Sequence, residues 1–265
     1  GGQLRSEWRP LVPVSISGRY TIDKKDAQVY KAGLGVVGSS SQTGGQTETL
    51  FSVATDYSNG DSWKQFSPRV SLDYQLSDDV MVYASYSEGF KSGGFDMRGD
   101  AAQIPSTVEG FDPETVETLE LGVKTELFDS RLRLNAAIFS TDYKDMQVTV
   151  QTESADGSAY KSDVLNAASA SVDGAELEAV GQITEALSLT ATVGYINAEY
   201  NQVMTDTAAG PVDLSDEWEF AFTPEWTGSL SLNHRQQLRD AGSLSFMLAT
   251  SYRAETRAFP NAATV

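Results

Sequence analysis

Hydrophobic and polar residues alternate along this chain with a period of two. Leu132, Leu134 and Ile138, for example, alternate with Arg133 and Asn135. Such alternation places apolar side chains on one face of a strand and polar side chains on the other. The pattern recurs in segments 12–22, 70–76, 80–86, 119–127, 132–138, 175–183, 187–195, 226–232 and 244–252, with an incomplete tenth segment at 4–8. Helical spacing is not sustained over comparable lengths, so the sequence predicts an all-β chain of nine or ten strands.

The links between the predicted strands are alternately short and long. The short links are 77–79, 128–131, 184–186 and 239–242, and the long polar links are 24–62, 91–113, 151–163 and 201–222. Outer-membrane barrels join their strands by short periplasmic turns and longer extracellular loops. Most links in a soluble sandwich are short. The spacing therefore predicts an antiparallel, up-and-down transmembrane β-barrel.

Hydropathy is consistent with membrane-spanning strands. The longest apolar run is about five residues, 80–84, whereas a membrane-spanning helix needs about 18. Barrel strands need no such run, because only every second side chain faces lipid. Tyr20, Tyr195 and Tyr252 each follow the first outward residue of a strand by about eight positions, or ~19 Å of height along a tilted strand. They are expected in an aromatic girdle at the membrane boundary.

The alternation also assigns each side chain to a face. The predicted outward residues are Leu121, Val123, Leu134, Ile138, Leu189, Val193, Leu230, Leu232, Phe246 and Leu248. The predicted inward residues are Glu120, Lys124, Glu126, Arg133, Glu178 and Thr192. Polar residues inside a barrel tune its selectivity, so Glu120, Lys124, Glu126 and Arg133 are candidate lumen-facing transport residues.

Composition narrows the function classes. The net charge of −18, from 37 acidic and 19 basic residues, disfavours binding to nucleic-acid phosphates. The chain has no cysteine and a single histidine, His234. These counts exclude a disulfide framework, a cysteine nucleophile and a His-rich metal cluster. No catalytic constellation is visible, so neither an enzyme, a cofactor nor a resident metal site is expected.

Several ordered motifs resemble one family. They are Phe66–Ser71, Val82–Phe95, Phe111–Glu114, Leu119–Lys124, Leu134–Phe139, Asp142–Gln147 and Gly174–Glu178. Together they cover roughly residues 63–200 and resemble the C-terminal barrel portion of TonB-dependent outer-membrane receptors. The resemblance implies a barrel of 22 strands with a plugged lumen, of which residues 1–265 supply about nine or ten strands. The plug domain, the TonB box and the closing C-terminal strands are expected to lie outside this sequence.

The resemblance further implies an energy-coupled importer in the bacterial outer membrane. Iron–siderophore complexes are the expected cargo. The implied partners are outer-membrane lipid and lipopolysaccharide, the TonB complex through the N-terminal region, and a small-molecule or metal-chelate ligand. A passive porin or channel is the first alternative, and a soluble or surface β-sheet adhesin module is the second.

The long links hold the candidate ligand residues of the extracellular side. They are Arg98, Asp216, Glu217 and Trp218. The link 201–222 carries five acidic residues and no basic one. It is interpreted either as a solvated loop that meets divalent cations near lipopolysaccharide, or as a capture site for a cationic or metal-bearing ligand. The tripeptide Arg98-Gly99-Asp100 is interpreted as a coincidence and not as an adhesion motif.

Overall fold

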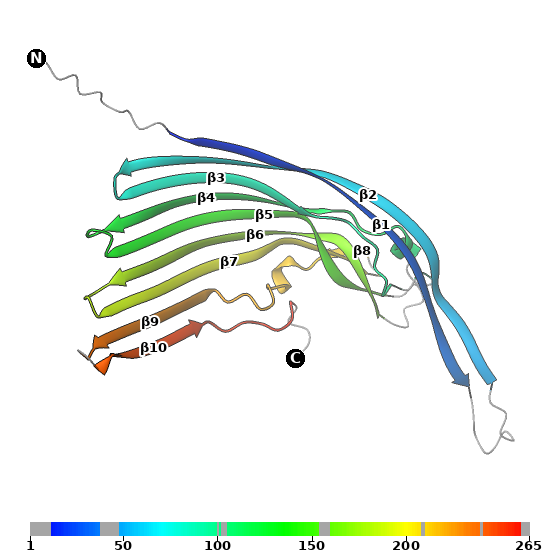
Figure 1. Cartoon of the computed structure of the whole chain (residues 1–265). Helices are drawn as coiled ribbons and strands as arrows, with labels where there is room; N and C mark the ends of the chain where they lie inside the picture. Colours follow the sequence, from blue (N-terminus) through cyan, green and yellow to red (C-terminus); the bar gives the residue numbers. More distant parts are fainter. Residues whose placement is uncertain are drawn as a thin grey trace, which may run out of the picture.

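The computed structural model describes residues 12–37, 48–99, 101, 105–153, 160–207, 210–238 and 241–260. These residues form one curved antiparallel sheet of ten strands (Figure 1). The strands are β1 (Val14–Val37), β2 (Glu48–Ser77), β3 (Val80–Lys91), β4 (Glu114–Leu127), β5 (Leu132–Glu153), β6 (Tyr160–Gln182), β7 (Leu187–Thr207), β8 (Gly210–Asp213), β9 (Trp226–Gln237) and β10 (Ser243–Arg253). Two short 3₁₀ turns, η1 (Pro105–Val108) and η2 (Ser215–Glu217), lie in the links. None of the described helical turns is long and apolar enough to cross a membrane.

Each strand pairs with its neighbour along the chain. The order is β1 to β7, then β9 and β10. The short strand β8 pairs with Met204–Thr207, the last residues of β7. The prediction of an all-β, antiparallel, up-and-down sheet of nine or ten strands is confirmed. The segment 4–8, predicted as a further strand, lies outside the described residues.

Tight turns join the strands at one end of the sheet. The predicted turns at 77–79, 128–131 and 184–186 are confirmed, and the turn at 239–242 is described only in part. Phe128, Asp129 and Ser130 all have positive φ, at 56°, 56° and 63°, a backbone conformation that costs roughly 1–2 kcal/mol per residue. The next residue, Arg131, donates from Nη2 to the carbonyl oxygens of Gln182 (3.1 Å) and Ile183 (2.9 Å). The side chain thus binds the strained turn to its neighbour.

The strand register separates the two predicted faces. Residues directly opposite each other in a ladder share a face. One row of partners runs through Leu121, Ile138, Ala175, Tyr195 and Trp226, and all the predicted outward residues lie on this apolar face. The six predicted inward residues all lie on the opposite, polar face. A slip of one residue would have mixed the two sets, so the prediction of separate faces is confirmed.

The apolar face is not covered by protein in the body of the sheet. Ile138 remains 57% exposed, and Tyr20 and Tyr252 also lie exposed on this face. Tyr195 packs against Trp226 with ring centroids 4.7 Å apart. A fully apolar sheet face of this kind is stable where hydrocarbon replaces water.

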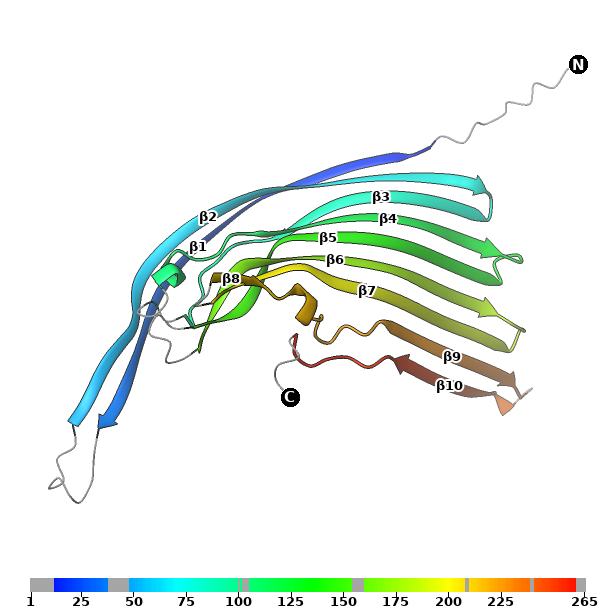
Figure 2. The ribbon, with the colours of Figure 1, turned by 180° about the vertical axis from the view of Figure 1, so that it is seen from behind.

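The first long link is not a loop, contrary to prediction. β1 extends to Val37 and β2 begins at Glu48, so most of residues 24–62 form a hairpin arm that projects beyond the other strands (Figures 1 and 2). The arm was missed because its apolar residues change face. Val29, Tyr57 and Trp63 lie on the polar-face side and are buried, and the Trp63 ring lies against Gly93 and Phe95 of the link between β3 and β4.

Two other long links are also shorter than predicted. β5 and β6 extend into the predicted link 151–163, and β7, β8 and η2 occupy much of the predicted link 201–222. Val203 is fully buried there with Val148 and Ala168, against Leu214 and Trp218. Strand pairing between β5 and β6, and between β7 and β8, therefore extends into these two links.

Candidate functional site

The centre of the polar face holds two of the predicted transport residues. Tyr83 donates its hydroxyl hydrogen to Glu120 at 2.7 Å, and the ammonium of Lys124 lies 5.3 Å from the Tyr83 ring centroid. Glu176 lies in the same row as Tyr83, with only Gly122 and Ala137 between them. The small side chains leave a shallow hollow bordered by charged groups. Tyr83 thus brings Glu120 and Lys124 into one cluster.

The other two predicted transport residues form a separate pair. Arg133 and Glu126 are direct cross-strand partners with an N–O distance of 3.2 Å. Ser130 of the adjacent turn also donates to Glu126, at 3.2 Å. More than half of each charged side chain is exposed, and such pairs contribute at most about 1 kcal/mol. The pair closes the β4–β5 hairpin at its turn end.

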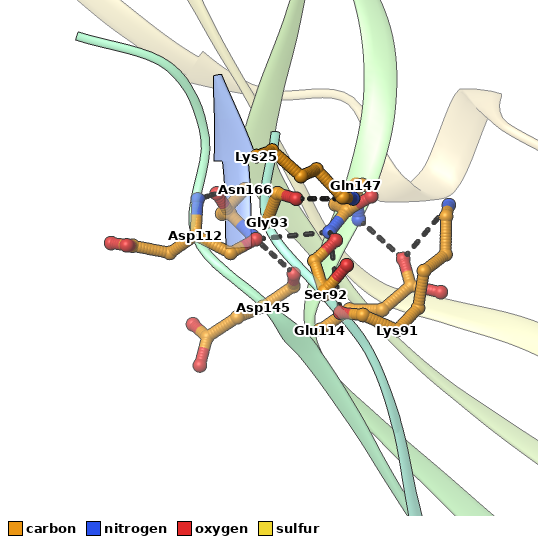
Figure 3. Close-up of polar contacts among 9 residues, drawn as sticks. All are labelled: Lys25, Lys91, Ser92, Gly93, Asp112, Glu114, Asp145, Gln147 and Asn166. Atoms are coloured by element: carbon orange, nitrogen blue, oxygen red, sulfur yellow. Dashed lines mark hydrogen bonds and ion pairs between the residues drawn. The ribbon is translucent and has the colours of Figure 1, made fainter. Parts of the chain in front are cut away.

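At the opposite end of the sheet, Asn166 of β6 connects the end of the 92–112 link to β5 (Figure 3). Its side-chain oxygen accepts a hydrogen bond from the Asp112 N–H at 2.7 Å. Its amide nitrogen donates to the carbonyl oxygens of Asp112 (2.8 Å) and Asp145 (2.7 Å). Asp145 has a φ of 53°, so Asn166 also satisfies the carbonyl of a strained residue.

Gln147 completes this connection. Its backbone N–H donates to Glu114 at 2.8 Å, and its amide nitrogen donates to the carbonyl oxygens of Ser92 and Asp112, both at 3.0 Å. We call the group Ser92, Asp112, Glu114, Gln147 and Asn166 the clasp (Figure 3). The clasp fixes both ends of the 92–112 link onto β5 and β6.

The 92–112 link is fixed on its other side by the hairpin arm. Lys25 donates from Nζ to the carbonyl oxygen of Gly93 at 2.7 Å. Asn59 donates to the carbonyl oxygen of Val108, also at 2.7 Å. Only glycine fits at position 93, since a Cβ would lie 2.3 Å from the carbonyl oxygen of Phe111 and 2.5 Å from the Trp63 ring. The described parts of the link, residues 92–99 and 105–112, are therefore fixed against the sheet.

Arg98 lies in this link and pairs within it. Its Nε lies 3.1 Å from Oδ1 of Asp96, a buried carboxylate. The side-chain hydrogen bond to Asp96, followed by the charge of the carboxylate, raises the pKa of Arg98 further above its ordinary value. Most of the Arg98 side chain is exposed, which leaves part of the guanidinium accessible to a ligand.

The other three predicted ligand residues lie in or next to η2, away from Arg98. Trp218 packs edge-on against Tyr200, with ring centroids 5.7 Å apart, whereas Asp216 and Glu217 are exposed. Asp213 holds the segment in place by accepting hydrogen bonds from the N–H groups of Val203 (2.9 Å) and Ser215 (3.0 Å). These two backbone bonds lower the pKa of Asp213. Trp218 thus has a packing role, and only the two carboxylates face solvent.

Sequence reasoning missed Tyr83, Gln147 and Asn166. Gln147 lies in a motif that the resemblance had singled out, but nothing in the alternation marks its contacts. Within the ranges that the structure describes, no three acidic or histidine side chains are grouped so that they could hold a metal ion. The arrangement offers charged and hydrogen-bonding groups to a solute.

The sequence and the fold both match one family. A sequence model described as the TonB-dependent receptor-like β-barrel matches residues 3–265. The ferric yersiniabactin uptake receptor FyuA of Yersinia pestis superimposes on 91% of this chain with a TM-score of 0.60 and 24% identity, over 31% of its own chain. The ferric-catecholate import receptor Fiu of E. coli K12 superimposes on 95% of this chain with a TM-score of 0.58 and 19% identity, over 33% of its own chain.

A characterised relative is more similar in sequence. The metal-pseudopaline receptor CntO of Pseudomonas aeruginosa is 34% identical over 145 residues, which cover 54% of this chain and 18% of the receptor. The matched region is thus about a fifth of that relative's length. Because the family match spans nearly the whole chain, the chain belongs to the TonB-dependent receptors, β-barrel proteins of the Gram-negative outer membrane that are not enzymes.

Proposed function

We propose that the complete protein imports an iron–siderophore complex through the outer membrane, driven by TonB. The observation that supports this most directly is the separation of one sheet into an exposed apolar face and a charged polar face. The apolar face suits contact with membrane lipid and lipopolysaccharide. The polar face suits the wall of a water-filled passage that a plug domain closes.

The cargo is a metal chelate in this proposal. Its support is the 34% identity to a receptor named for a metal–pseudopaline complex. The 92–112 link and the β8–η2 segment offer Arg98, Asp216 and Glu217 to a ligand arriving from outside. Glu120 and Lys124 lie deeper on the polar face and would contact the ligand or the plug during passage. Glu126 and Arg133 act in hairpin closure.

Uptake by whole cells tests the proposal. Cells carrying the complete gene would be given radioactive iron as citrate, hydroxamate or catecholate complexes, at concentrations too low for leakage through porins. We expect accumulation of iron from at least one chelate, and its loss in cells without functional TonB. Accumulation that continues unchanged without TonB would instead indicate a passive channel.

A further inference from the structure

Two arginines lie side by side on the polar face where β1, β2 and β3 meet. Arg19 is directly opposite Ser67, and Arg69 is directly opposite Ser17, so the arginines are diagonal neighbours across the β1–β2 ladder. Diagonal neighbours are about 7–8 Å apart, which long side chains can span. Both arginines are exposed. Two guanidinium groups can therefore approach one solute together.

Serine hydroxyls surround this pair. The neighbouring polar-face serines are Ser15, Ser17, Ser67, Ser71, Ser85 and Ser87. The Ser67 hydroxyl oxygen is buried and has no hydrogen-bond partner among the described residues. Because this oxygen is closed to solvent, a solute at the surface would meet the hydroxyls of Ser17 and Ser87, which lie directly opposite Arg69 on its two sides.

Neither arginine has a counter-charge in the described parts of the chain. Arg98, Arg133 and Arg257 each form an ion pair with a carboxylate, but Arg19 and Arg69 do not. Asp73 is four residues from Arg69 along β2, or about 13 Å at ~3.3 Å per residue. The two like charges repel each other unless an anion joins them.

We propose that Arg19 and Arg69, with Ser17 and Ser87, form a binding site for the carboxylate groups of an anionic metal chelate. The inference rests on the proposed import function and names the chemistry of the cargo. A guanidinium binds a carboxylate through two parallel N–H donors, and the serine hydroxyls supply further donors. The opposite face carries Tyr20 and Phe66 at this level.

Binding of ferric citrate to the purified full-length receptor tests the site. Ferric citrate is an anionic polycarboxylate chelate, and iron-free citrate serves as its competitor. We expect Arg19→Gln and Arg69→Gln each to weaken binding about tenfold or more, as for loss of a hydrogen bond to a charged group. Lysine at either position should weaken it less, because the charge remains while the planar fork is lost. Arg253→Gln, a polar-face arginine on β10, is the matched control and should bind as the parent does.

Two results would overturn the site. One is equal binding of ferric citrate by the parent and the Arg19→Gln/Arg69→Gln double variant. The other is absence of binding by the parent. If the parent does not bind and the double variant also has a lower melting midpoint, the arginines pair with a carboxylate of the protein itself.

A parallel uptake measurement distinguishes failure of the carboxylate site from failure of the proposed import function. Iron supplied as a neutral hydroxamate complex does not need the arginine pair. TonB-dependent uptake of that iron, together with absent citrate binding, would overturn only the carboxylate site. Citrate binding that depends on the arginines, together with no TonB-dependent uptake of any chelate, would overturn only the proposed import function.

Discussion

The sheet has a body, next to the tight turns, and a loop end, next to the long links. These two regions carry their apolar side chains on opposite faces of the same strands. In the body, Ile138 of β5 and Val193 of β7 lie on the apolar face and are 57% and 44% exposed. Toward the loop end, Val148 of β5 and Val203 of β7 are buried on the polar-face side, at 7% and 0% exposure. A strand can therefore reverse its amphipathic pattern without ending.

Register irregularities accompany the reversal in these strands. The β5–β6 pairing shifts between Tyr143 and Met146, and the β6–β7 pairing shifts between Ser169 and Ala170. An extra residue moves every later side chain to the other face. In β1 the reversal comes from the sequence alone, since Val29 has odd parity and Ile22 even parity in an unbroken register. In the body, the apolar side chains thus lie on the exposed outer face. At the loop end they lie on the polar-face side, against folded links.

The largest effect is expected from a charge on the body's apolar face. Val193→Arg should lower the free energy of unfolding by about 2–4 kcal/mol if the residue lies near the bilayer midplane. Thr192→Arg, one residue away on the polar face, should cost much less because its side chain stays in water. Urea titrations of the full-length protein in lipid vesicles measure both. Equal losses would contradict the assignment of faces.

A smaller effect is expected from the clasp. Asn166→Asp keeps the shape of the side chain but removes both donors to the Asp112 and Asp145 carbonyls. Gln147 still donates to the Asp112 carbonyl, so the cost is that of two lost hydrogen bonds at about 0.5–1.5 kcal/mol each, or about 1–3 kcal/mol. Hydrogen exchange in the 92–112 link should become faster. Asn233→Asp, whose amide makes only a 3.5 Å contact with Ser231, is the control. Unchanged exchange in the link would show that the clasp does not hold it.

The buried cluster at the loop end gives a smaller effect still. Val203→Ala should cost about 1–2 kcal/mol, from two lost methyl groups at ~0.8 kcal/mol per carbon, and should loosen β8. Val193→Ala removes the same atoms from an exposed position and should cost less. Hydrogen exchange of residues 210–218, together with the melting midpoint, compares the two variants. A larger decrease in the melting midpoint for Val193→Ala than for Val203→Ala would contradict this prediction.

The smallest effect is expected from pH at the β8–η2 segment. The folded pKa of Asp213 is lowered, so its contribution to stability is present above the unfolded pKa and lost as the pH falls through the folded value. The protection factors of residues 210–218, which compare the observed exchange rates with the intrinsic rates at each pH, should therefore fall in acid. Asp213→Asn should remove most of this pH dependence, whereas Asp216→Asn, at an exposed position, should leave it intact. The same pH dependence in both variants would exclude Asp213 as its source.

The alternation predicted the body of the sheet because one side of it is uniformly apolar. It placed Leu121 and Glu120 on the correct faces, along with every other residue so assigned. It could not predict the hairpin arm, because the residues that pack against Trp63 lie in a link distant in sequence. The arginine pair was hidden for a related reason: alternation puts Arg19 and Arg69 on the polar face, but only the register makes them neighbours.

The tight turns of the sheet also affect how it assembles. Closing a short connection costs less chain entropy than closing a long one, and contacts close in sequence form fastest. The pairs β2–β3, β4–β5, β6–β7 and β9–β10 are joined by short turns, so each should form as a ready-made hairpin before the long links bring hairpins together. We expect pulse-labelled hydrogen exchange during refolding to protect the β4–β5 ladder before the β3–β4 ladder. The sheet would then grow two strands at a time, and its longest links would close last.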